Sequence, residues 1–163
     1  GAPIRDAAGM LVHGSCVALG GDAVLLLGPS GSGKSDLALR LIHEGWRLVA
    51  DDQVALRVEK GGLLASAPPA LAGMLEVRGL GIFRGLPVAE PAPALRLAVH
   101  LAPREGVPRL PEPATWRAAG IAVPAVALHG LDASAPARIA FALGAATGRL
   151  RQHAGAFAAE EEA

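Results

Sequence analysis

The sequence is poor in cysteine, in net charge and in long apolar runs, and each shortage excludes a class of protein. The single cysteine, Cys16, excludes a disulfide framework and suits the reducing cytoplasm. Lys+Arg and Asp+Glu are both 15, so the formal net charge of +0 gives no electrostatic support for a nucleic-acid partner. Gly, Pro or charged residues interrupt every apolar run before the ~18 residues of a membrane helix, and no secretory signal opens the chain. We therefore expect a cytoplasmic protein with neither a nucleic-acid nor a membrane partner.

Aromatic residues are also scarce, with no Tyr and 3 Phe, although 52% of the residues are hydrophobic. We therefore expect an aliphatic core, with Cys16 interpreted as a small buried hydrophobe rather than a reactive thiol. A length of 163 residues predicts a single domain, residues 1–163, whose Ala/Glu tail from about residue 152 is expected to be disordered.

The first third of the chain predicts a strand, a tight turn, a second strand and then a loop. In "LVHGSCVALGGDAVLLLGPSGSGKS", Gly20-Gly21 is a two-residue hairpin signal between apolar runs. The register of this hairpin places Cys16 opposite Leu25 and His13 opposite Gly28. A helix follows over 34–44, with Leu37, Ala38 and Leu41 on one face and a stop at Gly45.

The remaining pattern completes an α/β fold. We predict strands in "WRLVADD" (46–52), in a hairpin that turns at Gly61-Gly62, at 95–101 and in "VPAVALHG" (123–130). We interpret 71–93 as irregular and the proline-rich 102–120 as a mobile loop. Ser134 is expected to cap a final helix that ends near Arg151. The fold class is a P-loop nucleotide-binding domain, with a mixed β-sheet flanked by helices.

The segment "GPSGSGKS" satisfies the phosphate-loop pattern G-x-x-x-x-G-K-[ST] between a predicted strand and a predicted helix. Glycines let backbone N–H groups turn toward phosphate oxygens, while Lys34 would reach the outer phosphates and the Ser35 hydroxyl would bind Mg²⁺. The predicted cofactors are ATP and Mg²⁺. The predicted nucleotide-binding residues are Gly28, Pro29, Ser30, Gly31, Ser32, Gly33, Lys34 and Ser35.

Two carboxylates, Asp51 and Asp52, end the strand that follows this helix. If this strand runs parallel to the one at 23–27, its carboxyl end shares the ligand-binding edge of the sheet. One carboxylate would then organise Mg²⁺ while the other accepts a proton from an attacking hydroxyl. The alternative is a solvated turn. His13 is either a partner of Asp52 or of phosphate, or an ordinary edge-strand histidine.

In order and spacing, "LVHG", "GPSGSGKSDLALRLIHEGWRLVADD" and "LEVRGLGI" resemble the catalytic domain of the HPr kinase/phosphorylase family. The resemblance is firm over residues 12–83 and looser to 150. It implies ATP-dependent phosphorylation of a seryl hydroxyl on HPr, the phosphocarrier protein of the bacterial phosphotransferase system. It also implies the reverse reaction, in which phosphate attacks the phosphoseryl protein and releases pyrophosphate. The chain resembles a short form of the family with the catalytic domain only, and the resemblance implies a homo-oligomer, a hexamer.

Position by position, the resemblance assigns catalytic roles to His13, Lys34 and Asp52, and magnesium ligation to Ser35 and Glu76. Arg109 in "VPRLP" corresponds to an essential arginine that the family carries in an Asp-Arg-Leu-Gly context of its flexible loop, although the Asp and the Gly of that context are both proline here.

A second departure is "HGLD" (129–132), which replaces a Pro-Gly-Arg-Asn segment that the family links to dephosphorylation. We therefore expect detectable kinase activity and weak phosphate-dependent dephosphorylation.

Two other functions remain open on the sequence. A P-loop small-molecule kinase would need a lid, for which 102–120 is the candidate. A non-catalytic ATP-sensing regulator would need no Asp52.

Overall fold

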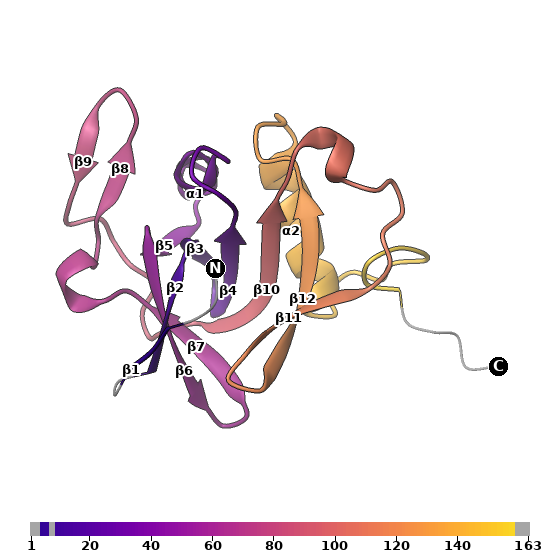
Figure 1. Cartoon of the computed structure of the whole chain (residues 1–163), viewed down its shortest axis with the longest axis horizontal. Helices are drawn as coiled ribbons and strands as arrows, with labels where there is room; N and C mark the ends of the chain where they lie inside the picture. The colour runs from indigo at the N-terminus through magenta and orange to yellow at the C-terminus, as the bar shows by residue number, and fades with distance from the viewer. Residues whose placement is uncertain (1–3, 7–8, 159–163) are drawn as a thin grey trace.

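The computed structural model describes residues 4–6 and 9–158, which form a curled β-sheet, a short separate hairpin and two helices (Figure 1). The helices are α1 (Lys34–His43) and α2 (Ala135–Ala146), and short 3-10 turns lie at Pro69–Leu71 and Arg104–Gly106. The strands are β1 (Ile4–Asp6), β2 (Gly9–His13), β3 (Ser15–Leu19), β4 (Asp22–Leu27), β5 (Arg47–Ala50), β6 (Gln53–Glu59), β7 (Gly62–Ser66), β8 (Leu75–Val77), β9 (Gly81–Phe83), β10 (Ala94–Leu101), β11 (Ala114–Ala118) and β12 (Ile121–Leu128).

The main sheet is mixed, as expected, and it forks at β10. Its order is β1-β2-β6-β7-β10-β4-β3-β5, and β12 and then β11 extend from β10. β10 runs parallel to β4 and β12, whereas the hairpins and outer ladders are antiparallel. The first residue of β10, Ala94, pairs with Leu64 of β7, while its last residues, 98–101, pair with β12. Two branches of the sheet, one through β7 and one through β12, therefore start from β10, and the sheet curls around the end of β4.

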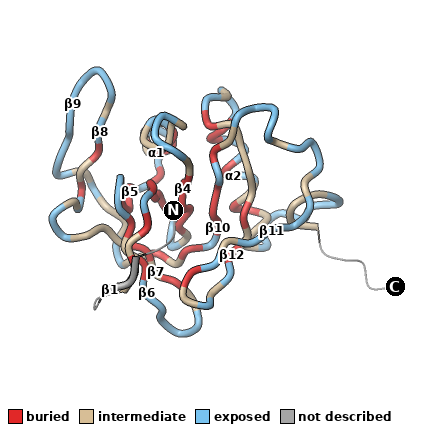
Figure 2. Tube along the Cα trace, in the orientation of Figure 1, coloured by how far each residue is buried: buried red, intermediate tan, exposed pale blue. Residues whose placement is uncertain are grey.

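Alternate residues of β4 face two different hydrophobic clusters. Val24 and Leu26 pack with the inner faces of both helices, so α1 and α2 cover the same side of the sheet. Leu25 and Leu27 pack with residues of β6, β7 and β12 on the other side. Figure 2 shows the buried chain running along β3, β4 and β10, and the core is aliphatic, as predicted. Neither helix of the described part of the chain is long and apolar enough to cross a membrane.

Local patterns in the first third of the chain are confirmed. β3 and β4 pair through a turn at Gly20-Gly21, with Cys16 opposite Leu25 as predicted. Cys16 is fully buried, and burial raises the pKa of its thiol well above the usual range. α1 buries the predicted face of Leu37, Ala38 and Leu41 and ends just before Gly45. β5 is antiparallel to β3, which is antiparallel to β4, so β5 and β4 run in the same direction.

The predicted pairing of His13 with Gly28 is wrong. The ladder with β4 ends at Ser15, and His13 instead pairs with Gln53 of β6. Gly14 separates β2 from β3 because the chain lies close to β4 there, and a Cβ on Gly14 would lie 2.7 Å from the Leu26 carbonyl oxygen. The single strand expected here is therefore two strands, β2 and β3, which lie in different parts of the sheet.

Other differences involve weakly patterned segments. The region interpreted as irregular contains the β8–β9 hairpin, and the expected loop 102–120 contains β11, which pairs with β12 alone among the described strands. The β6–β7 turn falls at Lys60-Gly61, since Glu59 pairs with Gly62. Ser134 does occupy the N-cap position of α2, but its side chain makes no capping hydrogen bond, and the helix ends at Ala146.

The tail expected to be disordered falls partly outside the described residues. Residues 159–163 are not described, whereas residues 152–158 form turns. The Phe157 backbone N–H donates to the Gln152 side-chain oxygen at 2.7 Å, and Phe157 packs against the cluster beneath the helices.

We predict that Gly14→Ala lowers the free energy of unfolding by about 1–3 kcal/mol, because the added Cβ would overlap the Leu26 carbonyl. Gly21→Ala is the matched control, since a Cβ there meets no atom within 4 Å, and we expect a change of about 0.5 kcal/mol or less. Urea denaturation of both variants measures the difference. Equal stabilities would contradict the close approach of the chain to β4.

Candidate active site

Residues 28–35, which run from the loop between β4 and α1 into the first turn of α1, are the predicted cradle for phosphate. Gly28, Gly31 and Gly33 have positive φ angles of 157°, 82° and 94°. The Ser32 N–H donates to the Pro29 carbonyl at 3.0 Å. A Cβ on Gly28 would lie 2.6 Å from Ser32 Oγ, a buried hydroxyl that has no hydrogen-bond partner in the described part of the chain. Only glycine therefore fits at position 28 with the loop in this form. α1 begins at Lys34, directly after the loop, and points its N-terminus at the cradle.

Lys34 lies across this cradle. Its Nζ donates to the Gly28 carbonyl at 2.5 Å and to the Pro29 carbonyl at 3.1 Å. Partial burial lowers the pKa of the Lys34 ammonium, while the charges of Asp51 and Asp52 oppose this shift. An anion in the cradle would favour the charged form of Lys34.

Asp51 connects the end of β5 to the cradle. Its Oδ1 accepts hydrogen bonds from Ser35 Oγ at 2.9 Å and from Ser15 Oγ at 2.7 Å. Ser15 is 1% exposed, so its hydroxyl depends on Asp51 for its hydrogen bond. Sequence reasoning missed Ser15, since nothing in the apolar run marks it as a partner of Asp51. A serine hydroxyl beside a carboxylate is an oxygen donor set that fits Mg²⁺.

Asp52 is placed quite differently from its neighbour. Its side chain is 67% exposed, and its Oδ1 lies 3.5 Å from Nδ1 of His13, which is 54% exposed. The residue has a φ of 71°, and its carbonyl accepts the Gly14 N–H at 3.0 Å. The structure thus brings His13 and Asp52 together beside the cradle. Of the two neighbouring carboxylates, Asp51 is held by serine hydroxyls, whereas Asp52 faces solvent.

Glu76 and Arg109 lie apart from these contacts. Glu76 is an exposed residue of β8, in the hairpin that projects beside α1 (Figure 1). Arg109 is exposed in the connection between β10 and β11. Among the side chains of residues 9–158, neither Glu76 nor Arg109 has a hydrogen bond or ion pair, and no group of three or more His, Cys, Asp or Glu residues is arranged to hold a metal ion.

The segment 129–132 packs directly on the cradle. Gly130 is buried against Leu101, and a Cβ there would lie 3.3 Å from the Ser32 carbonyl oxygen. Arg40 of α1 donates to the Gly130 and Asp132 carbonyls, the latter at 3.2 Å. Arg104 donates to the Asp132 carboxylate at 2.6 Å, and this hydrogen bond lowers the pKa of Asp132. The segment therefore joins the phosphate loop to the connection that follows β10.

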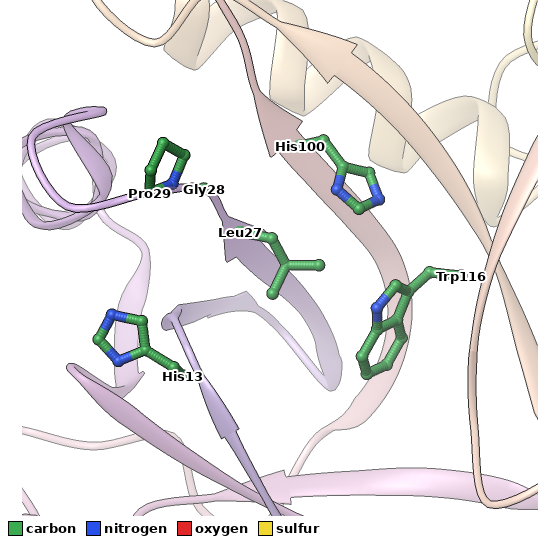
Figure 3. Close-up of a pocket in the computed structure, with 6 residues that line it drawn as sticks. All are labelled: His13, Leu27, Gly28, Pro29, His100 and Trp116. Carbon is green, nitrogen blue, oxygen red and sulfur yellow. The ribbon is translucent and has the colours of Figure 1, made fainter. Parts of the chain in front are cut away.

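A cleft of about 450 Å³ opens beside the first residues of the loop (Figure 3). His13, Gly28 and Pro29 line it together with Leu27, His100 and Trp116. No role was predicted for His100 from the sequence. None was predicted for Trp116 either, because Trp116 lies in a segment interpreted as a loop. The fork of the sheet at β10 brings both residues to the site.

Comparisons with known proteins agree on one family. The family model for the HPr Serine kinase C-terminal domain matches residues 6–109. An HPr kinase/phosphorylase of Clostridium tetani is 52% identical over 71 residues, which are 44% of this chain and 23% of that protein. An HPr kinase/phosphorylase of Clostridium beijerinckii is 43% identical over 94 residues, 55% of this chain and 31% of that protein. The chain thus matches about a quarter to a third of the length of these relatives.

The fold is similar to that of the Hpr(Ser) kinase/phosphatase from Coxiella burnetii. The TM-score is 0.69 at 30% sequence identity, over 79% of this chain and 85% of that chain.

We predict that Ser15→Ala lowers the free energy of unfolding by about 1 kcal/mol, because it removes a buried hydrogen bond to Asp51. Ser134→Ala is the matched control: Ser134 is exposed and makes no capping hydrogen bond, so its removal should cost about 0.5 kcal/mol or less. Both values come from urea denaturation. A larger loss at Ser134 would favour the cap expected from the sequence.

Proposed function

Because the chain belongs to the family of the HPr Serine kinase C-terminal domain, we propose that it transfers the outer phosphoryl group of ATP to a seryl hydroxyl of an HPr-like phosphocarrier protein. The observation that carries this proposal is the unequal placement of the two carboxylates. Asp51 is hydrogen-bonded to Ser35 of the cradle, and the exposed Asp52 lies beside His13, where a protein hydroxyl can approach. A nucleotide-sensing regulator has no need of the second carboxylate.

The nucleotide would lie in the cradle of residues 28–35. Backbone N–H groups of the loop and the Lys34 ammonium would hold its phosphates. Ser35 would bind Mg²⁺, and Asp51 would orient Ser35 through their hydrogen bond. The metal ion would neutralise charge on the phosphates. Glu76 is a further proposed ligand, based on the family resemblance, and it would have to approach from the β8–β9 hairpin.

Asp52 would act as the general base in this reaction. Its carboxylate would take the proton of the seryl hydroxyl as the oxygen attacks the outer phosphorus atom, and ADP would leave. His13 would orient Asp52 from 3.5 Å away. Arg109 would reach the transferred phosphoryl group from its exposed connection, and its positive charge would stabilise the transition state.

The same groups would permit the reverse reaction. An oxygen of inorganic phosphate would attack the phosphorus of the phosphoseryl residue, forming pyrophosphate, while Asp52 returns its proton to the seryl oxygen. We propose that this direction is the weaker one, because His129-Gly130-Leu131-Asp132 replaces the arginine and asparagine that the resemblance links to it. We also propose a cytoplasmic homo-oligomer, a hexamer by the family resemblance.

We predict that the protein phosphorylates the HPr-like protein of its own organism once, and that Lys34→Ala lowers the rate by about 10²-fold or more. The variant would leave the outer phosphates with backbone donors only. The measurement is mass spectrometry of the acceptor after incubation with Mg²⁺ and ATP. Lys60→Ala, in the exposed β6–β7 turn, is the control and should retain the rate. Absence of transfer by the unaltered protein would refute the proposed activity.

We predict that Asp52→Asn keeps nucleotide affinity within a few-fold and slows transfer by about 10²–10⁴-fold, because an amide cannot take the hydroxyl proton. Calorimetric binding of ATP and the transfer rate separate these effects. Asp22→Asn is the control, since Asp22 pairs with Arg96 and Arg149 at the other end of β4. If Asp51→Asn slows turnover more than Asp52→Asn while binding is unchanged, the roles of the two carboxylates are inverted.

A further inference from the structure

The cleft beside the phosphate loop contains two side chains that have no part in the mechanism above. His100 and Trp116 lie on one side of the cleft, and His13 lies on the other (Figure 3). Leu27, the last residue of β4, lies between them, and Gly28 and Pro29 continue from it into the cradle. A ligand in this cleft would therefore lie against the first residues of the phosphate loop.

The position of His100 is set by the central strands. It pairs in register with Leu27 of β4 and Ala127 of β12, so it is level with the start of the loop. Ala98, two residues earlier on the same face of β10, is fully buried, whereas His100 is exposed. Within the described part of the chain, its ring nitrogens have no hydrogen-bond partner.

Trp116 is fixed by packing on one side only. It pairs with Val123 in the β11–β12 ladder and is partly buried against the hydrophobic cluster on that face. Its indole lies along the cleft (Figure 3). The indole nitrogen is a hydrogen-bond donor with no acceptor capacity, and it has no hydrogen-bond partner among residues 9–158.

The chemistry of the lining favours an anion. Among the residues that the structure describes, the polar side chains that line the cleft are two imidazoles and one indole, and no carboxylate lines it. The nearest acid described above, Asp52, faces Nδ1 of His13. Imidazole and indole N–H groups donate hydrogen bonds, and the adjoining loop adds backbone donors and the helix N-terminus. The volume of about 450 Å³ accommodates a phosphoryl group together with the side chain that bears it.

We propose that His100 and Trp116 form a phosphate-binding subsite on the acceptor side of the phosphate loop. It holds the phosphoryl group of a phosphoseryl residue, or inorganic phosphate, next to the outer phosphate position of the nucleotide. His100 is the principal donor, and Trp116 supplies the wall and a second N–H. This assignment rests on the proposed function, since it names the group that the same site holds on the acceptor side.

Trp116 supplies a direct measurement of binding. The chain has 2 Trp and no Tyr, so Trp46→Phe leaves Trp116 as the sole indole. With the protein saturated with Mg²⁺ and ADP, inorganic phosphate and O-phosphoserine are titrated separately while tryptophan emission is recorded. We expect a saturable change with at least one probe, and the probe that binds identifies the source of the phosphoryl group. Because Trp46 is buried, calorimetry on the protein with Trp46 intact repeats the titration in case Trp46→Phe does not fold.

Variants of His100 decide the assignment. His100→Ala is expected to weaken binding of the probe by about tenfold or more, the effect of losing a hydrogen bond to a charged group. His100→Gln retains an N–H donor and should recover most of that affinity. His153→Ala, at an exposed position in the C-terminal turns, is the matched control and should bind as the unaltered protein does. ADP affinity should stay within twofold in all three variants.

Three results would overturn the subsite: equal affinity of His100→Ala and His153→Ala, no binding of either probe, or binding seen by calorimetry without any change in Trp116 emission. Trp116→Phe gives an independent check by calorimetry, and we expect it to weaken binding several-fold because phenylalanine lacks the N–H. These titrations involve no acceptor protein and no transfer. A protein that binds phosphate through His100 but fails to phosphorylate its acceptor would refute the proposed function and leave the subsite standing.

Discussion

The convergence of two serine hydroxyls on one oxygen of Asp51 is the contact on which the site depends. Ser15 belongs to β3, Ser35 to the first turn of α1, and Asp51 follows β5, so one carboxylate joins three elements. Because Ser15 is buried, loss of this contact would leave a polar group without a partner, which costs more than the hydrogen bond alone. The distance between the phosphate cradle and the end of β5 is thereby fixed. Because Asp52 directly follows Asp51, the same contact also fixes the position of Asp52.

The segment 129–132 also supports the cradle, because it packs directly against it. Arg40 reaches from α1 to the backbone of this segment, and the Asp132 carboxylate accepts hydrogen bonds from Arg104 and Arg138. The Arg104 side chain is 71% exposed, so its ion pair contributes little to the free energy of folding. Its effect is on orientation, because it holds the start of the β10–β11 connection against the segment beside the phosphate loop. Arg109 lies further along the same connection.

The parts of this fold that could be predicted from the sequence are those that depend on neighbouring residues. The β3–β4 register followed from a two-residue turn, and the buried face of α1 followed from helical spacing. The pairing of His13 could not be predicted, because it depends on the close approach of Gly14 to Leu26 across the sheet. β11 was missed because it pairs at the edge of the sheet with β12 and its own pattern is weakly apolar. The same holds for the cleft: His100 and Trp116 line it together because β12 and then β11 extend from β10.

The central position of β10 also has a consequence for the growing chain on the ribosome. β4 and its phosphate loop are complete by residue 35, but the strand that pairs with the other edge of β4 comprises residues 94–101. Until this strand emerges, β4 presents an open edge of unpaired backbone groups flanked by apolar side chains, which is a template for aggregation. The nascent N-terminal half therefore cannot close its own sheet until β10 has been synthesised.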